Sequence, residues 1–157
     1  MPTIRVQTED FDAGAEIAQI RAGNPRVGAV ASFVGTCRDT NDGDAVAAMT
    51  LEHYPGMTEK ALAQIVDEAI ARWRVLDVTV VHRVGELKPG DQIVLVVVSG
   101  AHRGEAFAAC EFLMDYLKTR APFWKKEQTP AGARWVEARA SDDEAAARWV
   151  AGTKDAA

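Results

Sequence analysis

The feature that most constrains the fold of this chain is an uninterrupted run of aliphatic residues, Ile93 to Val98. The run follows a glycine-containing turn segment and ends near Gly100, and most of its residues are β-branched, which favours a strand over a helix. A strand that is apolar at every position has to be covered on both faces. We therefore expect residues 91–99 to form a central, fully buried strand.

Apolar periodicity predicts other elements on both sides of this strand. Alternating or compact apolar segments predict strands at 4–6, 27–34, 46–54, 75–84 and 134–137, with an extended segment at 123–127. Helical spacing predicts helices at 12–22, 58–73, 104–119 and 142–150. We expect loops or turns at 35–43 and 85–90, and a frayed tail after the last helix. The element order predicts an α+β fold with helices packed on a largely antiparallel sheet.

Two of the predicted helices carry an apolar face that should bury against the sheet. In the first helix the face consists of Leu62, Ile65, Val66, Ala69 and Ile70. In the second it consists of Phe107, Cys110, Leu113, Met114 and Leu117. Pro122 prevents the second helix from continuing.

Length and composition point to a cytoplasmic protein of one domain, covering residues 1–157. No segment approaches the roughly 20 apolar residues of a membrane span, and the first residues lack the apolar core of a signal peptide. The two cysteines, Cys37 and Cys110, lie far apart, so we expect free thiols and no metal site. The net charge of −5 argues against a nucleic-acid partner.

A basic cluster interrupts this acidic chain at residues 118–126, which read KTRAPFWKK. Like charges repel, so such a cluster costs stability unless an anion is bound there. A second basic pair, His102 and Arg103, follows the central strand where a helix begins, a position that favours anions. A third basic residue, Arg38, lies in the loop at 35–43. Together these groups predict a pocket for a phosphate, a carboxylate or both.

Each basic residue also has a simpler interpretation. Lys118 can be a solvated helix-end lysine, or an inward lysine whose pKa is lowered by neighbouring cations and whose neutral form is nucleophilic. Arg38 and Arg103 can be solvated loop arginines. In an extended segment, Lys125 shares a face with Phe123, and Lys126 lies on the opposite face, so only one of these two lysines would enter the pocket.

The remaining residues with reactive or titratable side chains are weaker candidates for a functional role. Cys37 has no histidine or aspartate next to it in the sequence and is a weak candidate for a nucleophile. His82 alternates with valines and is expected to be a half-buried histidine with its hydrogen bonds satisfied. His53 is expected to be structural, and we find no convincing acid–base pair of carboxylates.

Four segments of the chain, in order, resemble the large, catalytic subunit of molybdopterin synthase. The resemblance covers most of the chain, from about Phe33 to Trp149. The segments are LEHYPGMTE at 51–59, HRVGEL at 82–87, GAHR at 100–103 and MDYLKTRAPFWKKE at 114–127.

This resemblance implies an enzyme that transfers sulfur during molybdenum cofactor biosynthesis. The substrate is then cyclic pyranopterin monophosphate (precursor Z), which gains the dithiolene of molybdopterin. The sulfur donor is a small ubiquitin-like subunit with a thiocarboxylated C-terminal glycine, in a Gly-Gly tail. The family forms homodimers within a heterotetramer and has an α/β hammerhead-type fold with a small additional β subdomain. Neither a cofactor nor a metal is implied.

The resemblance also assigns site residues. The positions implied to bind substrate are Thr36, Cys37, Arg38, His102, Arg103, Lys118, Lys125, Lys126 and Glu127. Lys118 and Lys125 correspond to the lysines that the family ties to catalysis. Cys37 departs from the family pattern, which weakens a thiol mechanism further.

Two other classes of function remain open from the residues alone. A small α+β domain with an anion pocket can be a regulatory module that binds an anionic metabolite without turnover. Phe123, Trp124 and the flanking lysines can also form a stacking groove for single-stranded nucleic acid, although the acidic balance disfavours it.

Overall fold

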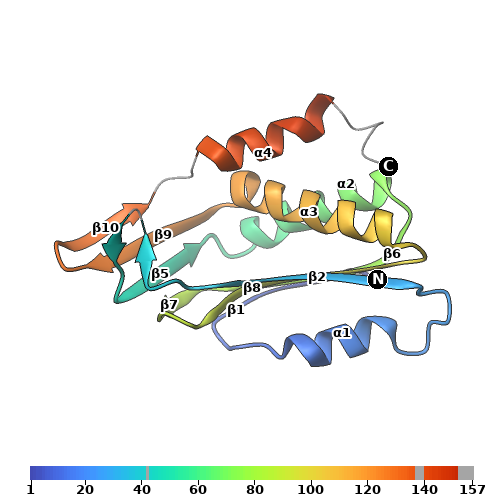
Figure 1. Ribbon diagram of the computed structural model, residues 1–157, viewed down its shortest axis with the longest axis horizontal. Coiled ribbons are helices and arrows are strands. Elements are labelled where there is room, and N and C mark those ends of the chain that lie inside the picture. Colours follow the sequence, from blue (N-terminus) through green and yellow to red (C-terminus); the bar gives the residue numbers. More distant parts are fainter. Residues whose placement is uncertain (42, 137–139, 152–157) are drawn as a thin grey trace.

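The apolar run forms the inner part of a four-stranded sheet in the computed structural model, which describes residues 1–41, 43–136 and 140–151 (Figure 1). The strand order is β1-β6-β8-β2. The bounds are β1 (Thr3–Gln7), β2 (Ala29–Thr36), β6 (Val75–Arg83) and β8 (Gln92–Gly100). Strand β8 pairs antiparallel with both of its neighbours, and only β1 runs parallel to its partner, β6. The prediction of a central strand is confirmed.

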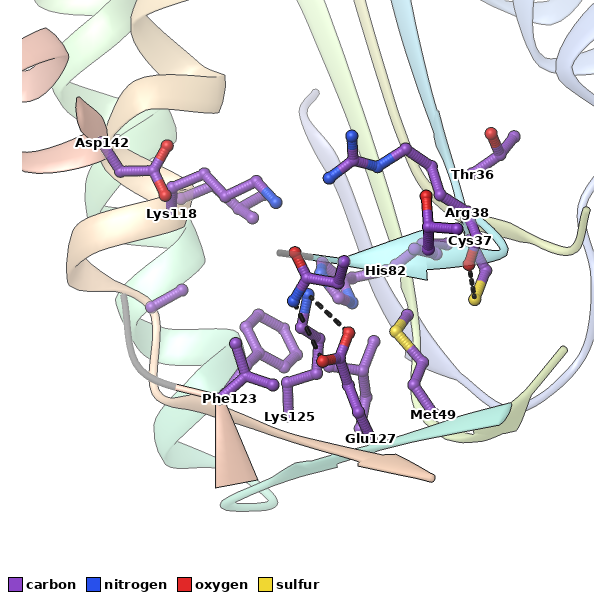
Figure 2. Close-up of a pocket in the computed structure, with 17 residues that line it drawn as sticks. Thr36, Cys37, Arg38, Met49, His82, Lys118, Phe123, Lys125, Glu127 and Asp142 are labelled. Carbon is purple, nitrogen blue, oxygen red and sulfur yellow. Dashed lines mark hydrogen bonds and ion pairs between the residues drawn. The ribbon is translucent and has the colours of Figure 1, made fainter. Parts of the chain in front are cut away.

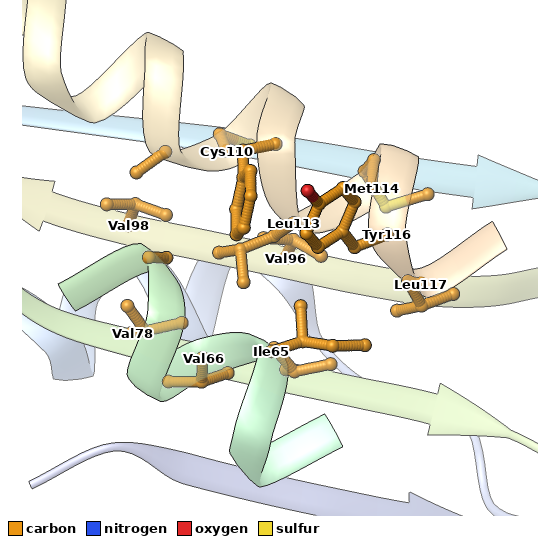
Figure 3. Packing of buried hydrophobic residues seen from close by; sticks show 14 of the residues in the cluster. Ile65, Val66, Val78, Val96, Val98, Cys110, Leu113, Met114, Tyr116 and Leu117 are labelled. Atoms are coloured by element: carbon orange, nitrogen blue, oxygen red, sulfur yellow. The ribbon is translucent and has the colours of Figure 1, made fainter. Parts of the chain in front are cut away.

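Helices cover both faces of this sheet, as the composition of β8 requires. Helices α2 (Met57–Arg72), α3 (Arg103–Arg120) and α4 (Ala140–Ala151) lie on one face, and α1 (Ala13–Arg21) lies on the other (Figure 1). Val96 and Val98 belong to the larger core cluster beneath α2 and α3 (Figure 3), whereas Leu95 and Val97 pack with Ile20 of α1. Alternate residues of one strand thus supply two separate cores.

A second antiparallel sheet lies at the end of the molecule where α3 finishes (Figure 1). Its order is β10-β9-β5-β7, with bounds β5 (Ala48–His53), β7 (Gly85–Leu87), β9 (Phe123–Thr129) and β10 (Gly132–Val136). A separate antiparallel pair of short strands, β3 (Thr40–Asn41) and β4 (Asp44–Ala45), precedes β5 in the chain. The predicted α+β class, with a largely antiparallel sheet and a small additional β subdomain, is confirmed.

Several predicted boundaries differ from those observed. The turn expected at 85–90 contains β7, and the loop expected at 35–43 contains β3. Each of these strands is too short to produce a periodic pattern, and each is defined by its pairing with a distant or neighbouring strand. The last strand begins at Gly132 rather than 134. Its expected end at 137, and the tail after 151, lie outside the described residues.

Two residues assigned to apolar helix faces are exposed. Phe107 has 65% of its surface exposed and Ile70 has 38%. Helix α3 approaches the core through the small residues Ala106 and Ala109, which are almost fully buried. The buried arc is therefore centred about 100° away from Phe107, since successive helical residues are rotated by that angle. The rest of both predicted faces is buried.

The described helices include none that is both long and apolar enough to cross a membrane.

Gly28 marks a point where two backbone segments approach so closely that no side chain fits. A Cβ atom at this position would lie 2.2 Å from the carbonyl oxygen of Ala101, and the Gly28 amide donates a hydrogen bond to the Gly100 carbonyl at 3.0 Å. We expect Gly28→Ala to lower the free energy of unfolding by about 1–3 kcal/mol, because backbone has to move. Urea denaturation measures this change.

Gly104→Ala is the matched control for this substitution. A Cβ atom at Gly104, in the first turn of α3, would meet no atom within 4 Å apart from neighbouring backbone of its own helix. Alanine is also the better helix former, so this variant should be neutral or slightly stabilised. Equal stabilities of the two variants would contradict the prediction, because they would show that the backbone accommodates a Cβ atom at Gly28 without loss of stability.

Candidate active site

A cavity of about 340 Å³ lies between the C-terminal end of α3 and the second sheet (Figure 2). Its walls come from elements spread along the sequence, from β2 to α4. Thr36 ends β2, Met49 lies in β5, His82 in β6, Lys118 in α3 and Lys125 in β9. Cys37 and Arg38 line it from the loop after β2, and Asp142 lines it from α4.

The break after α3 explains why Lys118 and Lys125 reach the same cavity. Pro122 cannot continue the helix, and its carbonyl accepts a hydrogen bond of 3.0 Å from the hydroxyl of the buried Thr58 on α2. The chain then turns into β9, whose side chains alternate between two faces. Phe123, Lys125 and Glu127 face the cavity.

The outward face of β9 carries Trp124 and Lys126, as expected from the alternation. The ammonium of Lys126 lies 5.6 Å from the ring centroid of Trp135, and Trp124 packs edge-on against Tyr54 at 4.4 Å between centroids. Lys126 is therefore not brought into the cavity. Because Phe123 and Trp124 lie on opposite faces, they also do not form the continuous stacking groove considered for nucleic acid.

Two cationic side chains face each other across the cavity. Figure 2 shows the Lys118 amine and the Arg38 guanidinium pointing toward one another from opposite walls. Opposed positive charges repel, and an anion placed between them removes that repulsion. Of the basic groups predicted to form one pocket, the structure brings together Arg38, Lys118 and Lys125.

Glu127 is the buried carboxylate of this cavity. Its residue surface is 3% exposed, and one carboxylate oxygen accepts a hydrogen bond of 2.9 Å from the side-chain amide of Asn41. The other oxygen lies 4.0 Å from the ammonium of Lys125 (Figure 2). Glu127 therefore compensates part of the positive charge, on the side of the cavity away from Lys118.

His82 is more deeply buried than expected and lines the cavity. Its Nδ1 lies 2.8 Å from the carbonyl oxygen of Arg83, which can only accept, so Nδ1 carries the proton. The ring stacks on Phe123 with 3.8 Å between centroids. Burial lowers the pKa of His82 to about 4, so the ring is neutral near pH 7. The sequence signal is its alternation with valines near the end of an apolar strand, which predicts a half-buried histidine with satisfied hydrogen bonds but does not indicate that the ring lines a cavity.

Cys37 is buried in the wall of the cavity. Burial raises the pKa of its thiol, which keeps it protonated near neutral pH. Its sulfur lies 3.8 Å from the Arg38 carbonyl oxygen. These properties support the interpretation that Cys37 is not a nucleophile.

His102 and Arg103 are exposed and lie at the opposite end of α3. Arg103 and Lys118 are separated along the helix axis by about 22 Å at a rise of 1.5 Å per residue. A single chain therefore does not bring this basic pair into the cavity that contains Lys118. The expectation of one cavity for all the basic groups is met only in part.

The fold and the cavity define a class: an α+β protein with a cationic cavity, at a helix–strand junction, suited to anionic reactants. Residues 6–120 match the family model described as MoaE protein. The chain is 70% identical over 149 residues to the molybdopterin synthase catalytic subunit of Ralstonia nicotianae, covering 95% of this chain and 85% of that protein. It is 60% identical over 146 residues to the same subunit of Escherichia coli, covering 93% and 97%.

Solved structures agree with the sequence relatives. The molybdopterin biosynthesis MoaE protein from Burkholderia ambifaria superimposes with a TM-score of 0.82 at 64% identity, covering 96% of this chain and 99% of that one. Molybdopterin synthase from Staphylococcus aureus superimposes with a TM-score of 0.77 at 33% identity, covering 84% and 95%. The chain belongs to the MoaE protein family, and the resemblance found in its motifs is confirmed.

Proposed function

We propose that this chain is the catalytic subunit of a molybdopterin synthase, and that its cavity receives the two reactants of sulfur transfer. The substrate is precursor Z, and the donor is the thiocarboxylated C-terminus of a small ubiquitin-like subunit. The observation that carries the proposal is the cavity in which Arg38, Lys118 and Lys125 converge, in a chain whose relatives are catalytic subunits of this enzyme.

The charges of the reactants fit this cavity. Precursor Z carries a cyclic phosphate, and the donor tail ends in an anionic thiocarboxylate. The thiocarboxylate sulfur attacks a carbon of the pterin side chain and displaces an oxygen substituent, which leaves with the electrons of the broken C–O bond. Donor and substrate are then joined as a thioester through the acyl C–S bond of the donor. Cleavage of that bond by water leaves the sulfur on the substrate and returns the donor as a carboxylate. The carbonyl oxygen becomes negatively charged in the tetrahedral intermediate, where a fixed cation stabilises it most.

In this mechanism Lys118 contacts the thiocarboxylate end. It stabilises the tetrahedral oxyanion as the C–S bond breaks, or accepts the acyl group briefly through its amine. Lys125 orients the reactants and transfers protons, while Arg38 binds the phosphate. The neutral ring of His82 and the thiol of Cys37 line the cavity without adding charge.

We also propose that His102 and Arg103 bind the phosphate and pterin from a second copy of the chain. Their distance from Lys118 prevents them from doing so within one chain, and both side chains are exposed. A homodimer with one small subunit at each end gives the heterotetramer implied by the family. We infer a cytoplasmic location for this assembly, supported by two buried cysteines that are not paired.

Reconstitution tests the proposal directly. Mixing this protein with precursor Z and a thiocarboxylated small subunit should yield a dithiolene, detected as a fluorescent pterin after oxidation. The same mixture with the small subunit in its carboxylate form is the control and should give no product. Binding of precursor Z without dithiolene formation would instead support the regulatory module.

A further inference from the structure

The two carboxylate oxygens of Glu127 contact different groups. One oxygen accepts from Asn41 at 2.9 Å and from the Nε and Nη2 atoms of Arg134, each at 3.4 Å. The other oxygen faces the ammonium of Lys125 at 4.0 Å. The charge of this buried carboxylate is therefore shared between a cavity lysine and an arginine that does not line the cavity.

Arg134 lies on β10 and connects three strands through one guanidinium. Its Nη1 donates to the carboxylate of Asp44 on β4 at 2.8 Å, and its Nη2 donates to the carbonyl oxygen of Asn41 on β3 at 3.2 Å. The contact with Glu127 adds β9. Arg134 thus joins both strands of the β3–β4 pair to the strand that carries Lys125.

The β3–β4 pair depends on such contacts, because two strands of two residues each do not hold a position by themselves. The backbone supports the residues that flank the pair, with one bond reaching β9. The Val46 amide donates to the Asp39 carbonyl at 2.7 Å, and the Ala47 amide donates to the Gln128 carbonyl at 2.9 Å. Arg38 follows Cys37, whose amide donates to the Asp91 carbonyl and whose carbonyl accepts from the Gly90 amide, each at 2.8 Å. Arg38 thus lies between this fixed backbone and β3, and the β3–β4 pair sets its position from one side.

From these contacts we propose that Arg134 is a positioning residue for sulfur transfer. It fixes the segment that carries Arg38, and it occupies one oxygen of Glu127 so that the positive charge of Lys125 stays available to an anionic reactant. This role rests on the function proposed above. Without Arg134, the β3–β4 pair loses its contacts with the guanidinium. Glu127 keeps the hydrogen bond from Asn41, but among the described residues Lys125 is then the one cation that pairs with it.

The test is a KM-against-kcat comparison for precursor Z in the reconstituted enzyme. Arg134→Gln should raise KM about tenfold or more while changing kcat less, because Lys118 is untouched and the lost function is anion binding. Arg134→Lys, which keeps the charge, should recover part of the affinity. A purely structural role would instead reduce the active fraction, which lowers the apparent kcat and leaves KM unchanged.

Arg148→Gln is the matched control. Arg148 also pairs with two carboxylates, Glu111 and Asp115, but it links α4 to α3 and does not contact the β3–β4 pair. Its KM should equal that of the wild type. If Arg134→Gln fails to fold, Asp44→Asn decides, because Asp44 is exposed and this change removes the negative charge from the outer contact of Arg134 alone. It should raise KM about threefold, since one of three anchoring contacts is weakened.

The outcomes separate this inference from the proposed function. Wild-type protein that makes dithiolene, together with an unchanged KM in Arg134→Gln or in the deciding variant Asp44→Asn, overturns the role of Arg134 alone. Wild-type protein that makes none overturns both. A raised KM in Arg134→Gln with a normal KM in Arg148→Gln supports the positioning role.

Discussion

Lys118→Ala is expected to abolish dithiolene formation while the protein remains folded. The amine faces Arg38 across the cavity (Figure 2), where the thiocarboxylate is proposed to bind. Removing one fixed group that stabilises a developing oxyanion typically costs a factor of about 10²–10³ in rate, and loss of a covalent step would cost more. The side chain of Lys118 is exposed, so its truncation should change stability by only about 0.5 kcal/mol.

Single-turnover formation of the fluorescent pterin, with circular dichroism to confirm folding, measures this effect. Lys60→Ala is the control, because Lys60 is an exposed lysine on α2 that does not line the cavity, and it should retain full activity. Lys118→Arg separates the two roles of the amine. Substantial activity in that variant indicates that charge suffices, whereas an inactive variant indicates a nucleophilic amine. Near-normal product from Lys118→Ala would remove Lys118 from the mechanism.

The core could be predicted from the sequence because its elements are long and strongly patterned. The run from Ile93 to Val98 can be accommodated only where both faces of a strand are covered, and the structure places it there. The second sheet was harder to predict. Strand β7 contains three residues, and its completely buried Leu87 pairs with Met49, from which it is separated by α2 and β6. Pairing between strands this short and this far apart in the chain produces no periodic pattern in the local sequence.

Part of the site could be predicted because strand alternation is a local property. It correctly separated Lys125, on the face of Phe123, from Lys126. The grouping of Arg103 with Lys118 ignored the length of the helix between them. An 18-residue helix extends about 27 Å, far more than a cavity of this size can bridge. Asn41 and Arg134 were not singled out, because their importance comes from Glu127, which they reach only in the folded chain.

The burial of His82 predicts that the protein loses stability in mild acid. The pKa of this ring is about 4 in the folded protein, against 6.5 for an ordinary histidine. Between these values the unfolded chain binds a proton that the folded protein excludes, so the free energy of unfolding falls as the pH falls. The full loss is about 3 kcal/mol below pH 4, and about 2 kcal/mol of it is present at pH 5. Above about pH 7.5 the ring is neutral in both states, and this group contributes almost no pH dependence.

Urea denaturation of the wild type and of His82→Asn between pH 7.5 and pH 5 tests this expectation. Asparagine can keep the hydrogen bond to the Arg83 carbonyl through its amide, but it cannot be protonated in this range. His82→Asn should be less stable at pH 7.5, because the stacking on Phe123 is lost, and its stability should then change little with pH. His102→Asn removes an exposed histidine and should keep the wild-type slope. An unchanged slope in His82→Asn would mean that a proton reaches this ring in the folded protein, and that the stacked face of the cavity is open to water.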